Sequence, residues 1–243
     1  MSNPWETIFT FTCDTITSIR RGASRFTMAV TLEWLGHSCF RLTSESGTRI
    51  LIDPFDDSIG YKVPPYECEI LLLSHNHYDS CARHLVKKGC QIIDRKGTHQ
   101  AGDLIIKAHP AWHDKLKGKD YGEVLIFSFE LDGLKWAYFS HIGSLPRDWV
   151  FEEIGDIDVA FIPVGGVFAL GPHEAKLLVD RIKPKLVVPM HFDTLSLSFT
   201  LLPLDEFKRL MKNIWREEWH VVTINPGGLS DETVMLHMNY WSD

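Results

Sequence analysis

Residues 74–79, which read SHNHYD, bring two histidines and an aspartate close together in the chain. Where the chain turns, the imidazoles of His75 and His77 can converge on one metal ion, and Asp79 offers an oxygen ligand or a proton acceptor beside it. Residues 68–74 are almost continuously apolar, which predicts a strand buried on both faces. A loop after such a strand holds its side chains on a rigid scaffold. The alternative is a pair of surface histidines beside a helix that Asp79 caps.

Three further histidines, His113, His141 and His191, each follow a predicted β-segment. If the strands end on the same side of a sheet, these side chains gather with His75 and His77 at one edge. One such histidine alone would more often be a core or surface residue. Several at strand ends are better explained by a shared metal ion, since histidine is the commonest side-chain metal ligand. The sequence therefore predicts a metal site.

Short strands are followed by inserted helices along the chain, and this order predicts sheets covered by helices. Residues 31–53 read as an antiparallel meander, and Asp132-Gly133 between two apolar runs predicts a hairpin. Helices are expected over three ranges: 79–88, 172–182 and 203–214. We expect one domain over residues 31–243, preceded by an N-terminal extension, residues 1–30, that can be poorly ordered.

The chain of 243 residues has a formal net charge of −7, which argues against a broad basic surface for nucleic acid. No apolar run approaches the roughly 20 residues that a transmembrane helix needs. The five cysteines are odd in number and include no CxxC pair, which is typical of free thiols in a reducing compartment. We therefore expect a cytoplasmic protein.

Taken together, the motifs resemble those of the metallo-β-lactamase superfamily, in which HxHxD follows a buried strand and a distant histidine precedes an aspartate, as His113 precedes Asp114 here. Three segments are similar to the branch that includes ascorbate-phosphate lactonase and N-acyl-phosphatidylethanolamine phospholipase D: residues 34–37 (WLGH), 51–54 (LIDP) and 74–79 (SHNHYD). Three more are similar to small prokaryotic hydrolases of that branch: residues 161–166 (FIPVGG), 171–175 (GPHEA) and 188–191 (VPMH).

The resemblance implies an α/β fold, the four-layer αβ/βα sandwich, with metal ions at one edge between two sheets. It assigns the first ion to three ligands: His75, His77 and His113. It assigns Asp79 and His191 to a second ion. Four further residues are expected beside the ligands or the substrate: His37, Asp53, Ser80 and Asp114. For the first two of these, a satisfied buried polar pair is the alternative.

Two positions depart from the superfamily pattern, which usually continues HxHxDH and has a bridging aspartate after a later strand. Ser80 replaces the final histidine, and His141 replaces the bridging aspartate. A serine hydroxyl is a poor zinc ligand, and a neutral imidazole has one lone pair and cannot bridge two ions. Loss of the carboxylate also removes a negative charge that offsets the repulsion between the ions. We therefore expect one tightly bound ion and a weaker or reorganised second site, for which Asp79, His141 and His191 form the alternative ligand set.

The predicted function is a metal-dependent hydrolase that uses a metal-activated water on an ester, lactone or phosphodiester bond of a small molecule. Asp79 is the predicted catalytic residue, because it can orient that water or accept its proton. Zinc is the expected ion, although histidine and carboxylate ligands also suit manganese or iron. Lys115, Lys117 and Lys119 can attract an anionic substrate, but a solvated loop is the favoured interpretation of these lysines.

Two other functions stay open at this point. A degenerate member of the superfamily could bind metal or ligand without turnover, and Ser80 and His141 are the evidence for it. A metal-dependent nuclease is disfavoured by the negative net charge. The oligomeric state is also open, and a homo-oligomer is compatible with the resemblance because relatives often assemble.

Overall fold

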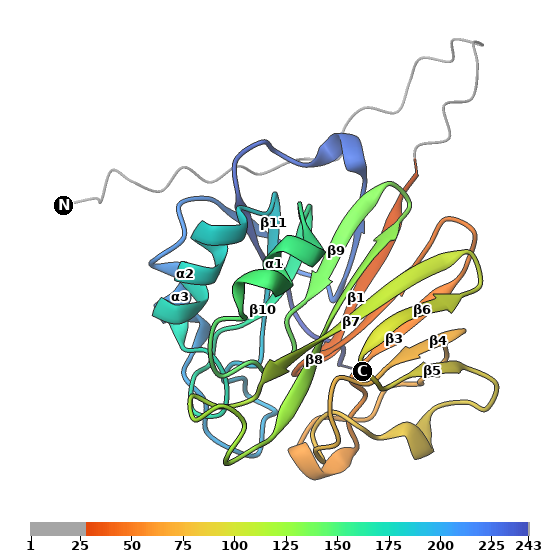
Figure 1. Ribbon diagram of the computed structural model, residues 1–243, viewed down its shortest axis with the longest axis horizontal. Helices are drawn as coiled ribbons and strands as arrows, with labels where there is room; N and C mark the ends of the chain where they lie inside the picture. Colours follow the sequence, from red (N-terminus) through yellow and green to blue (C-terminus); the bar gives the residue numbers. More distant parts are fainter. Residues whose placement is uncertain (1–27, 243) are drawn as a thin grey trace.

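Two β-sheets form the centre of the computed structural model, which describes residues 28–242 (Figure 1). The smaller sheet has the order β13-β1-β2-β3-β4-β5, with strands β1 (Val30–Gly36), β2 (Cys39–Thr43), β3 (Arg49–Ile52), β4 (Ile70–Leu72), β5 (Gln91–Ile93) and β13 (Val221–Ile224). The larger sheet has the order β12-β14-β11-β10-β9-β8-β7-β6, with strands β6 (Gly97–Ala101), β7 (Leu104–Trp112), β8 (Glu123–Leu131), β9 (Leu134–Tyr138), β10 (Val159–Pro163), β11 (Leu186–Met190), β12 (Ile214–Arg216) and β14 (Val234–His237).

Side chains of the smaller sheet enter two different cores on its two faces. In β4, Ile70 and Leu72 belong to the main core, which they share with Phe127 and Phe161 of the larger sheet. Leu71, between them, belongs to a second core on the other face. Successive side chains of a strand point to opposite faces, so a strand covered on both sides is apolar at every position. This explains the nearly continuous apolar run of residues 68–74.

Three helices cover the larger sheet: α1 (Asp148–Ile154), α2 (Pro172–Ile182) and α3 (Leu204–Lys208) (Figure 1). α2 begins with proline at its first position and has Glu174 in its first turn, where a missing N–H and a negative charge are both favourable. Its buried face, which includes Leu178 and Val179, joins the main core together with Phe207 of α3.

The outer face of the smaller sheet is covered by loops and short 3₁₀ turns. Phe55, Tyr61 and Tyr66 lie here with the turns η1 (Asp57–Ile59) and η2 (Arg83–Leu85). The α/β sandwich predicted from the sequence is therefore confirmed. The described residues contain no α-helix on this face, so its outer layer is built from irregular chain.

The helix expected over residues 79–88 is wrong, and only η2 forms there. The backbone N–H groups of this segment are bonded elsewhere: Ala82 donates to the Pro54 carbonyl at 2.8 Å and Lys87 to the Tyr66 carbonyl at 3.2 Å. These bonds to the loop over the second core replace helical ones. The helix expected over residues 203–214 is also too long, because α3 ends early and the chain continues into β12.

The meander and the hairpin are confirmed by the strand pairing. β2 pairs antiparallel with both β1 and β3, and β8 pairs antiparallel with β9 across Asp132 and Gly133. Both turn residues have positive φ, 48° and 74°, as the tight hairpin turn requires. The predicted extension, residues 1–30, lies outside the described residues apart from its last three.

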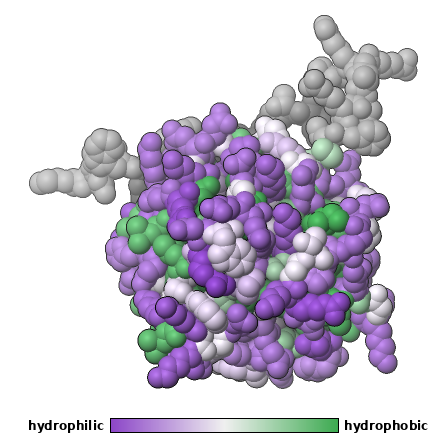
Figure 2. Space-filling view, in the orientation of Figure 1, coloured by the Kyte–Doolittle hydropathy of each residue, from purple (hydrophilic) through white to green (hydrophobic). Residues whose placement is uncertain are grey.

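The described surface shows no sign of a membrane span. Among residues 28–242, no helix is both long enough and apolar enough to cross a bilayer. On the face shown in Figure 2, hydrophilic residues predominate and hydrophobic ones are scattered.

Strand direction brings several loops to one edge of the sandwich. β1, β3 and β4 share a direction, because β2 is antiparallel to β1 and β3 while β4 is parallel to β3. β7, β9, β10 and β11 share a direction for the same reason in the larger sheet. The Ser74 carbonyl after β4 accepts a bond from the Leu125 N–H of β8 at 2.8 Å, which ties the two sheets together at this edge.

Two glycines allow the loops at this edge to approach each other closely. A Cβ placed on Gly165, after β10, would lie 2.2 Å from the carbonyl oxygen of His191. A Cβ on Gly143, after β9, would lie 2.3 Å from the carbonyl oxygen of His113. Both obstacles are backbone atoms, which cannot rotate away. These glycines therefore fix how near the two histidine loops can come to their neighbours.

Replacement of Gly165 by alanine should destabilise the protein by about 1–3 kcal/mol, because the added methyl group forces the backbone of His191 to shift. Urea unfolding followed by circular dichroism measures the change. Gly227→Ala is the matched control, since a Cβ there meets nothing within 4 Å. Equal stability of the two variants would contradict this account of the loop packing.

Candidate metal centre

Loops at the ends of six strands bring together histidine and carboxylate side chains that are far apart in the sequence. The residues involved are His37 after β1, Asp53 after β3, His75, His77 and Asp79 after β4, His113 after β7, His141 after β9 and His191 after β11. All except Asp53 belong to groups whose possible ligand atoms lie within 4.8 Å of one another. The structure therefore brings together the predicted ligands, and it adds His37 to them.

By the positions of their rings, His75, His77 and His113 form the first cluster, and the donor atoms of His75 lie within 4.8 Å of those of His113 and His141 and of those of His77 and Asp79. The ring centroids of the three histidines are separated by 4.7 Å, 4.8 Å and 4.9 Å. His113 is 2% exposed, whereas His75 and His77 are partly exposed. The cluster is thus held by the core on one side and reaches the surface on the other. This is the arrangement that an open, catalytic metal site requires.

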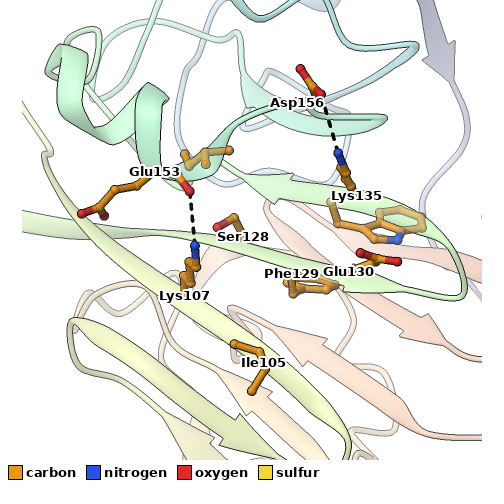
Figure 3. Close-up of a pocket in the computed structure, with 10 residues that line it drawn as sticks. Ile105, Lys107, Ser128, Phe129, Glu130, Lys135, Glu153 and Asp156 are labelled. Atoms are coloured by element: carbon orange, nitrogen blue, oxygen red, sulfur yellow. Dashed lines mark hydrogen bonds and ion pairs between the residues drawn. The ribbon is translucent and has the colours of Figure 1, made fainter.

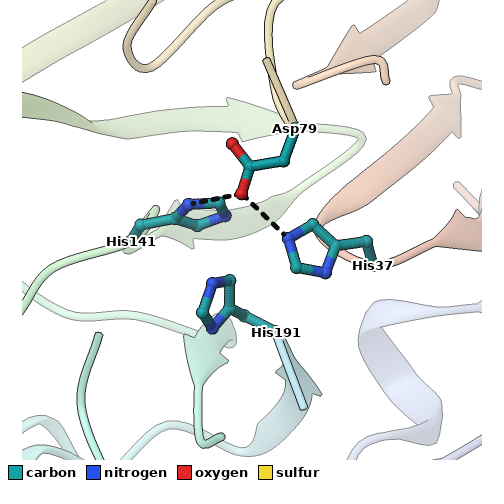
Figure 4. Close-up of side chains that lie close together, drawn as sticks. All are labelled: His37, Asp79, His141 and His191. Carbon is teal, nitrogen blue, oxygen red and sulfur yellow. Dashed lines mark hydrogen bonds and ion pairs between the residues drawn. The ribbon is translucent and has the colours of Figure 1, made fainter. Parts of the chain in front are cut away.

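His37, Asp79, His141 and His191 form the second cluster, and all four are buried (Figure 4). Nε2 of His37 lies 3.3 Å from Oδ2 of Asp79, and Nδ1 of His141 lies 3.8 Å from the same oxygen. The rings of His141 and His191 have centroids 4.3 Å apart. Three imidazoles and one carboxylate therefore surround a common point.

Several ring nitrogens in the two clusters are buried and have no hydrogen-bond partner within residues 28–242. They are both ring nitrogens of His113, both of His191, and Nδ1 of His37 and of His141. His109, four residues before His113, is also buried, but its nitrogens contact Glu153 and Ser128 at 3.0 Å each. Buried polar groups without partners are rare in native proteins, and a bound metal ion accounts for one nitrogen each of His113, His141 and His191. The donor set therefore fits a metal.

Burial keeps the imidazoles in the neutral form that binds metals. Burial and, secondarily, the charge of His113 lower the pKa of His75 to about 3. Burial likewise lowers the pKa of His113, and it lowers the pKa values of His141 and His191 well below the usual range. Each of these four rings therefore has a free lone pair at neutral pH.

Asp79 is ionised under the same conditions. Burial alone would raise its pKa, but the hydrogen bond with His37 and the neighbouring imidazoles outweigh burial and hold the pKa below its usual range. A carboxylate and neutral imidazoles are the protonation states that coordination needs.

The orientation of His75 is set by Ser74 and Asp53. The Ser74 hydroxyl donates its proton to Oδ2 of Asp53 at 2.5 Å and lies 2.7 Å from Nδ1 of His75. Because that proton is already used, Nδ1 must donate to the serine oxygen, which leaves Nε2 with the lone pair. Ser80 Oγ lies 3.2 Å from this Nε2. Ser80 is therefore placed beside the first cluster.

Asp53 and Asp114 hold backbone and side chains near the site without facing it. Asp53 also accepts from the Ser74 N–H and the Tyr138 hydroxyl, both at 2.7 Å, and burial raises its pKa to about 7. Asp114 accepts four backbone N–H groups of the loop that follows it, from Leu116, Gly118, Asp120 and Tyr121. Both carboxylates therefore hold the loops that carry the histidines. Asp53 bonds to Ser74 and Tyr138, and not to His37, with which a buried polar pair was the alternative expectation.

Four non-glycine residues at the strand ends adopt left-handed backbone conformations. The φ angles are 49° at His37, 46° at Asp53, 52° at Ser140 and 51° at His191. Such conformations are uncommon for these residue types and cluster at functional sites. They turn the chain immediately after each strand, which directs the side chain into the edge between the sheets. These left-handed conformations could not be predicted from the residue types alone.

Four aromatic rings in contact with one another form an aromatic rim that touches the first cluster through Tyr121 and His37 of the second cluster through Phe199: Tyr78, Tyr121, Phe168 and Phe199. The Tyr121 ring lies 5.4 Å from that of His113, and Tyr78 and Tyr121 are 61% and 43% exposed. Sequence reasoning missed the rim, because its members come from four separate loops and share no motif.

Some of the other charged side chains are paired. Lys115, one of the lysines considered for anion binding, donates to Oε1 of Glu174 at 2.6 Å. A separate pocket on β7, β8, β9 and α1 contains Lys107, which donates to the Glu153 carbonyl, and Lys135, which pairs with Asp156 (Figure 3). None of the candidate ligands lines that pocket. The histidine clusters are thus the stronger candidate site.

Comparison with known proteins decides the family. A profile described as a beta-lactamase superfamily domain matches residues 31–191. The chain belongs to this superfamily. A UPF0173 metal-dependent hydrolase of Thermococcus onnurineus is 30% identical over 82% of this chain and 97% of its own length. The narrower resemblance to ascorbate-phosphate lactonase and N-acyl-phosphatidylethanolamine phospholipase D stays a prediction.

Solved structures of the superfamily have the same fold. A Thermotoga maritima protein described as a Zn-dependent hydrolase of the metallo-beta-lactamase superfamily is 32% identical, with a TM-score of 0.72 over 86% of this chain and 98% of that one. A metallo hydrolase of Ignicoccus hospitalis is 24% identical, with a TM-score of 0.61 over 81% of this chain and 98% of that one. The second similarity concerns the fold alone.

Ser74→Ala should weaken zinc binding by about 10- to 100-fold, because His75 loses the group that fixes its ring and its tautomer. Competition with a chromophoric chelator measures the affinity. The control is Ser128→Ala, which removes a comparable bond to a buried histidine, His109, outside the clusters. If both variants bound zinc like the unmodified protein, Ser74 would have no part in positioning a ligand.

Proposed function

We propose that this chain is a metal-dependent hydrolase that cleaves an ester, lactone or phosphodiester bond in a small molecule, with a catalytic metal ion held by His75, His77 and His113. The observation that carries the proposal is the convergence of these imidazoles at an open edge, where His113 has no other partner for either nitrogen. The relatives named above, which are called metal-dependent and Zn-dependent hydrolases, support the same class of reaction.

A metal ion in this position would supply Lewis acidity: it lowers the pKa of water from 15.7 toward about 7 and polarises the oxygen of the bond under attack. The protein's own part is to hold the ligands. Ser74 and Asp53 keep the lone pair of His75 on Nε2, and the tight backbone contact with Gly143 fixes His113. Such preorganisation avoids rearrangement during the reaction.

Asp79 is the proposed catalytic residue, and its environment favours one of its two possible roles. Its pKa is held low by His37 and the neighbouring imidazoles, against the effect of burial. A carboxylate of low pKa accepts protons poorly near neutral pH. We therefore assign Asp79 the role of orienting the attacking water through a hydrogen bond, with release of the proton to solvent at the open edge.

The aromatic rim favours a substrate with an apolar or planar part. Tyr121 exposes ring surface beside the first cluster, and Phe168 lies 5.8 Å from the Tyr121 ring between centroids. Tyr78 exposes further ring surface beside Phe199. Such apolar surface would bind the apolar part of a substrate, while the metal ion acts on the polar bond that is hydrolysed. The anionic substrate considered from the lysines is less favoured, because Lys115 already pairs with Glu174.

Zinc is the proposed ion, tightly bound at the first cluster, with manganese or iron as alternatives. The free thiols of the described cysteines agree with action in the cytoplasm, which is part of the proposal. Assembly into a homo-oligomer stays a prediction. Binding of metal without turnover is the second candidate function, because Ser80 and His141 depart from the superfamily pattern.

His113→Ala should lose both the tightly bound ion and the hydrolytic activity, because it removes a ligand and opens the first cluster. Metal analysis by mass spectrometry and a panel of lactone, phosphodiester and thioester substrates, run with zinc, manganese and iron, measure the two effects. His109→Ala is the matched control on the same strand, since His109 already has two partners.

Retention of the ion and of the full rate in His113→Ala would reject the assignment. Bound metal in the unmodified protein with no turnover across the panel would favour the non-catalytic alternative. Salt-sensitive binding of single-stranded nucleic acid would instead support a nuclease.

Phe168→Ala should lower kcat/KM roughly tenfold for substrates that carry an aromatic or long acyl group, because the rim loses one ring. The comparison is with a small substrate of the same bond type that lacks the apolar group, for which little change is expected. Steady-state kinetics on the two substrates measure the difference. Equal losses on both would show that Phe168 has no part in recognising the apolar group.

A further inference from the structure

We propose that His37, Asp79, His141 and His191 form a closed, four-ligand metal site that stabilises the fold, to which Asp79 contributes Oδ2 while its other carboxylate oxygen stays available to orient the water at the first cluster. His37, from the loop after β1, supplies the ligand that Ser80 cannot supply at the position where the superfamily has histidine. The proposal goes beyond the proposed function, because it concerns a second ion and requires nothing of the substrate.

The distances between the donor atoms are close to those of a filled site. In a tetrahedral zinc site with bonds of about 2.0–2.1 Å, neighbouring ligand atoms lie roughly 3.4 Å apart. Nε2 of His37 is 3.3 Å and Nδ1 of His141 is 3.8 Å from Oδ2 of Asp79. The ring of His191 lies 4.3 Å from that of His141 and 4.7 Å from that of His37, between centroids. Small side-chain rotations would complete the site.

His141 is directed to this site by its other nitrogen. Its Nε2 lies 2.7 Å from the Ser38 hydroxyl, whereas its Nδ1 points toward Asp79 and has no hydrogen-bond partner among the described residues (Figure 4). Between centroids, the His141 ring lies 4.3 Å from His191, 4.7 Å from His75, 5.4 Å from His37 and 5.7 Å from His113. A donor atom of His141 also lies within 4.8 Å of donor atoms of His75 and His113. A neutral imidazole has one lone pair, so His141 serves one ion, and we assign it to the second cluster because its unpartnered Nδ1 lies 3.8 Å from Oδ2 of Asp79.

Burial distinguishes the second cluster from the first. His37, His141 and His191 are at most 1% exposed and Asp79 is 8% exposed, whereas His75 and His77 are partly exposed. Metal sites with four protein ligands are closed and structural, whereas catalytic sites keep a position open for water or substrate. With four protein donors and no exposed side, the second cluster has the character of a structural site.

Charge also favours an ion in this position. Asp79 is a buried carboxylate, and within this cluster its Oδ2 lies against the imidazoles of His37 and His141. An isolated buried charge is costly unless it is paired or coordinates a metal. A divalent cation would neutralise Asp79 and occupy the lone pairs that have no partner. The proton that now lies between His37 and Asp79 would move to Nδ1 of His37 or to solvent.

The test is the number of zinc ions bound by the full chain and by three variants, measured by mass spectrometry after dialysis against a zinc buffer. The unmodified protein should hold two ions. His37→Asn should hold one, because the amide is a poor zinc ligand; asparagine tolerates the left-handed backbone at this position, where φ is 49°. His37→Asn with Ser80→His should regain the second ion.

His113→Ala separates this inference from the proposed function. It should lose the first ion and keep the second, and zinc should still raise its Tm. His37→Asn should show the opposite: it keeps the first ion and loses most of the zinc-dependent rise in Tm. Two ions in His37→Asn with unchanged affinity would overturn the closed site and leave the proposed function intact. Two ions in His113→Ala would overturn the proposed first site instead.

Cobalt(II) in the unmodified protein gives a measurement that needs no variant. The absorption of four-coordinate cobalt at the second cluster should not change when a competing anion is added, whereas that of cobalt at the first cluster should change, because its open position accepts the anion. Weak bands from both ions, typical of five or six ligands, would overturn a closed site. Binding of a single ion that persists in His37→Asn would overturn it as well.

Discussion

The cost of burying imidazole nitrogens without hydrogen-bond partners is the constraint on which the rest of this structure depends. Six such nitrogens, on His37, His113, His141 and His191, are concentrated at one edge of the sandwich. An unsatisfied buried polar group costs about 1–3 kcal/mol, and the whole stability of a domain is only about 5–15 kcal/mol. A protein can keep such a group of histidines when a bound ligand offsets this loss of free energy, as coordination of a metal ion would.

The scaffold around the histidines is organised to hold them against that cost. Parallel strands of both sheets end at the same edge, and the loops between them are joined across the sheets by backbone contacts such as the bond from Leu125 to Ser74. Gly143 and Gly165 allow backbone contacts that any side chain would prevent. Left-handed turns at His37 and His191 are unfavourable locally and are retained because the surrounding core fixes them.

The sequence predicted the parts of the site that depend on strand order. His75, His77 and Asp79 follow an apolar run that predicted a strand buried on both faces, and His113, His141 and His191 each follow a strand of the other sheet. The order of strands in the sequence did not identify His37 as a metal ligand. Its place beside Asp79 depends on a left-handed turn after β1 and on packing between the sheets, neither of which has a periodic signal. The resemblance to a known superfamily showed that Ser80 stands where a ligand is usual, but it did not indicate that His37 could replace that ligand.

The errors in local structure have a related cause. Residues 79–88 have the composition of a helix, but their N–H groups bond to the loop that covers the second core. That loop, residues 54–67, contains the aromatic residues Phe55, Tyr61 and Tyr66, and its packing is tertiary information. Propensity over a short window is a weak predictor when long-range backbone bonds compete with it. The aromatic rim was missed for the same reason, since its rings meet only after four loops have folded.

The two departures from the superfamily motif are best understood together. A neutral imidazole at position 141 cannot bridge two ions as a carboxylate does, although the two clusters still adjoin each other at Asp79 and His141. Without that bridge, the proposed open site and the proposed closed site can differ in affinity, in exposure and in the metal they prefer. Ser80 then lies beside His75 at the open site, where its hydroxyl contacts the lone pair of Nε2, while His37 completes the buried set. On this interpretation the substitutions do not mark a failing enzyme. They convert a coupled two-metal centre into one ion for catalysis and one for stability.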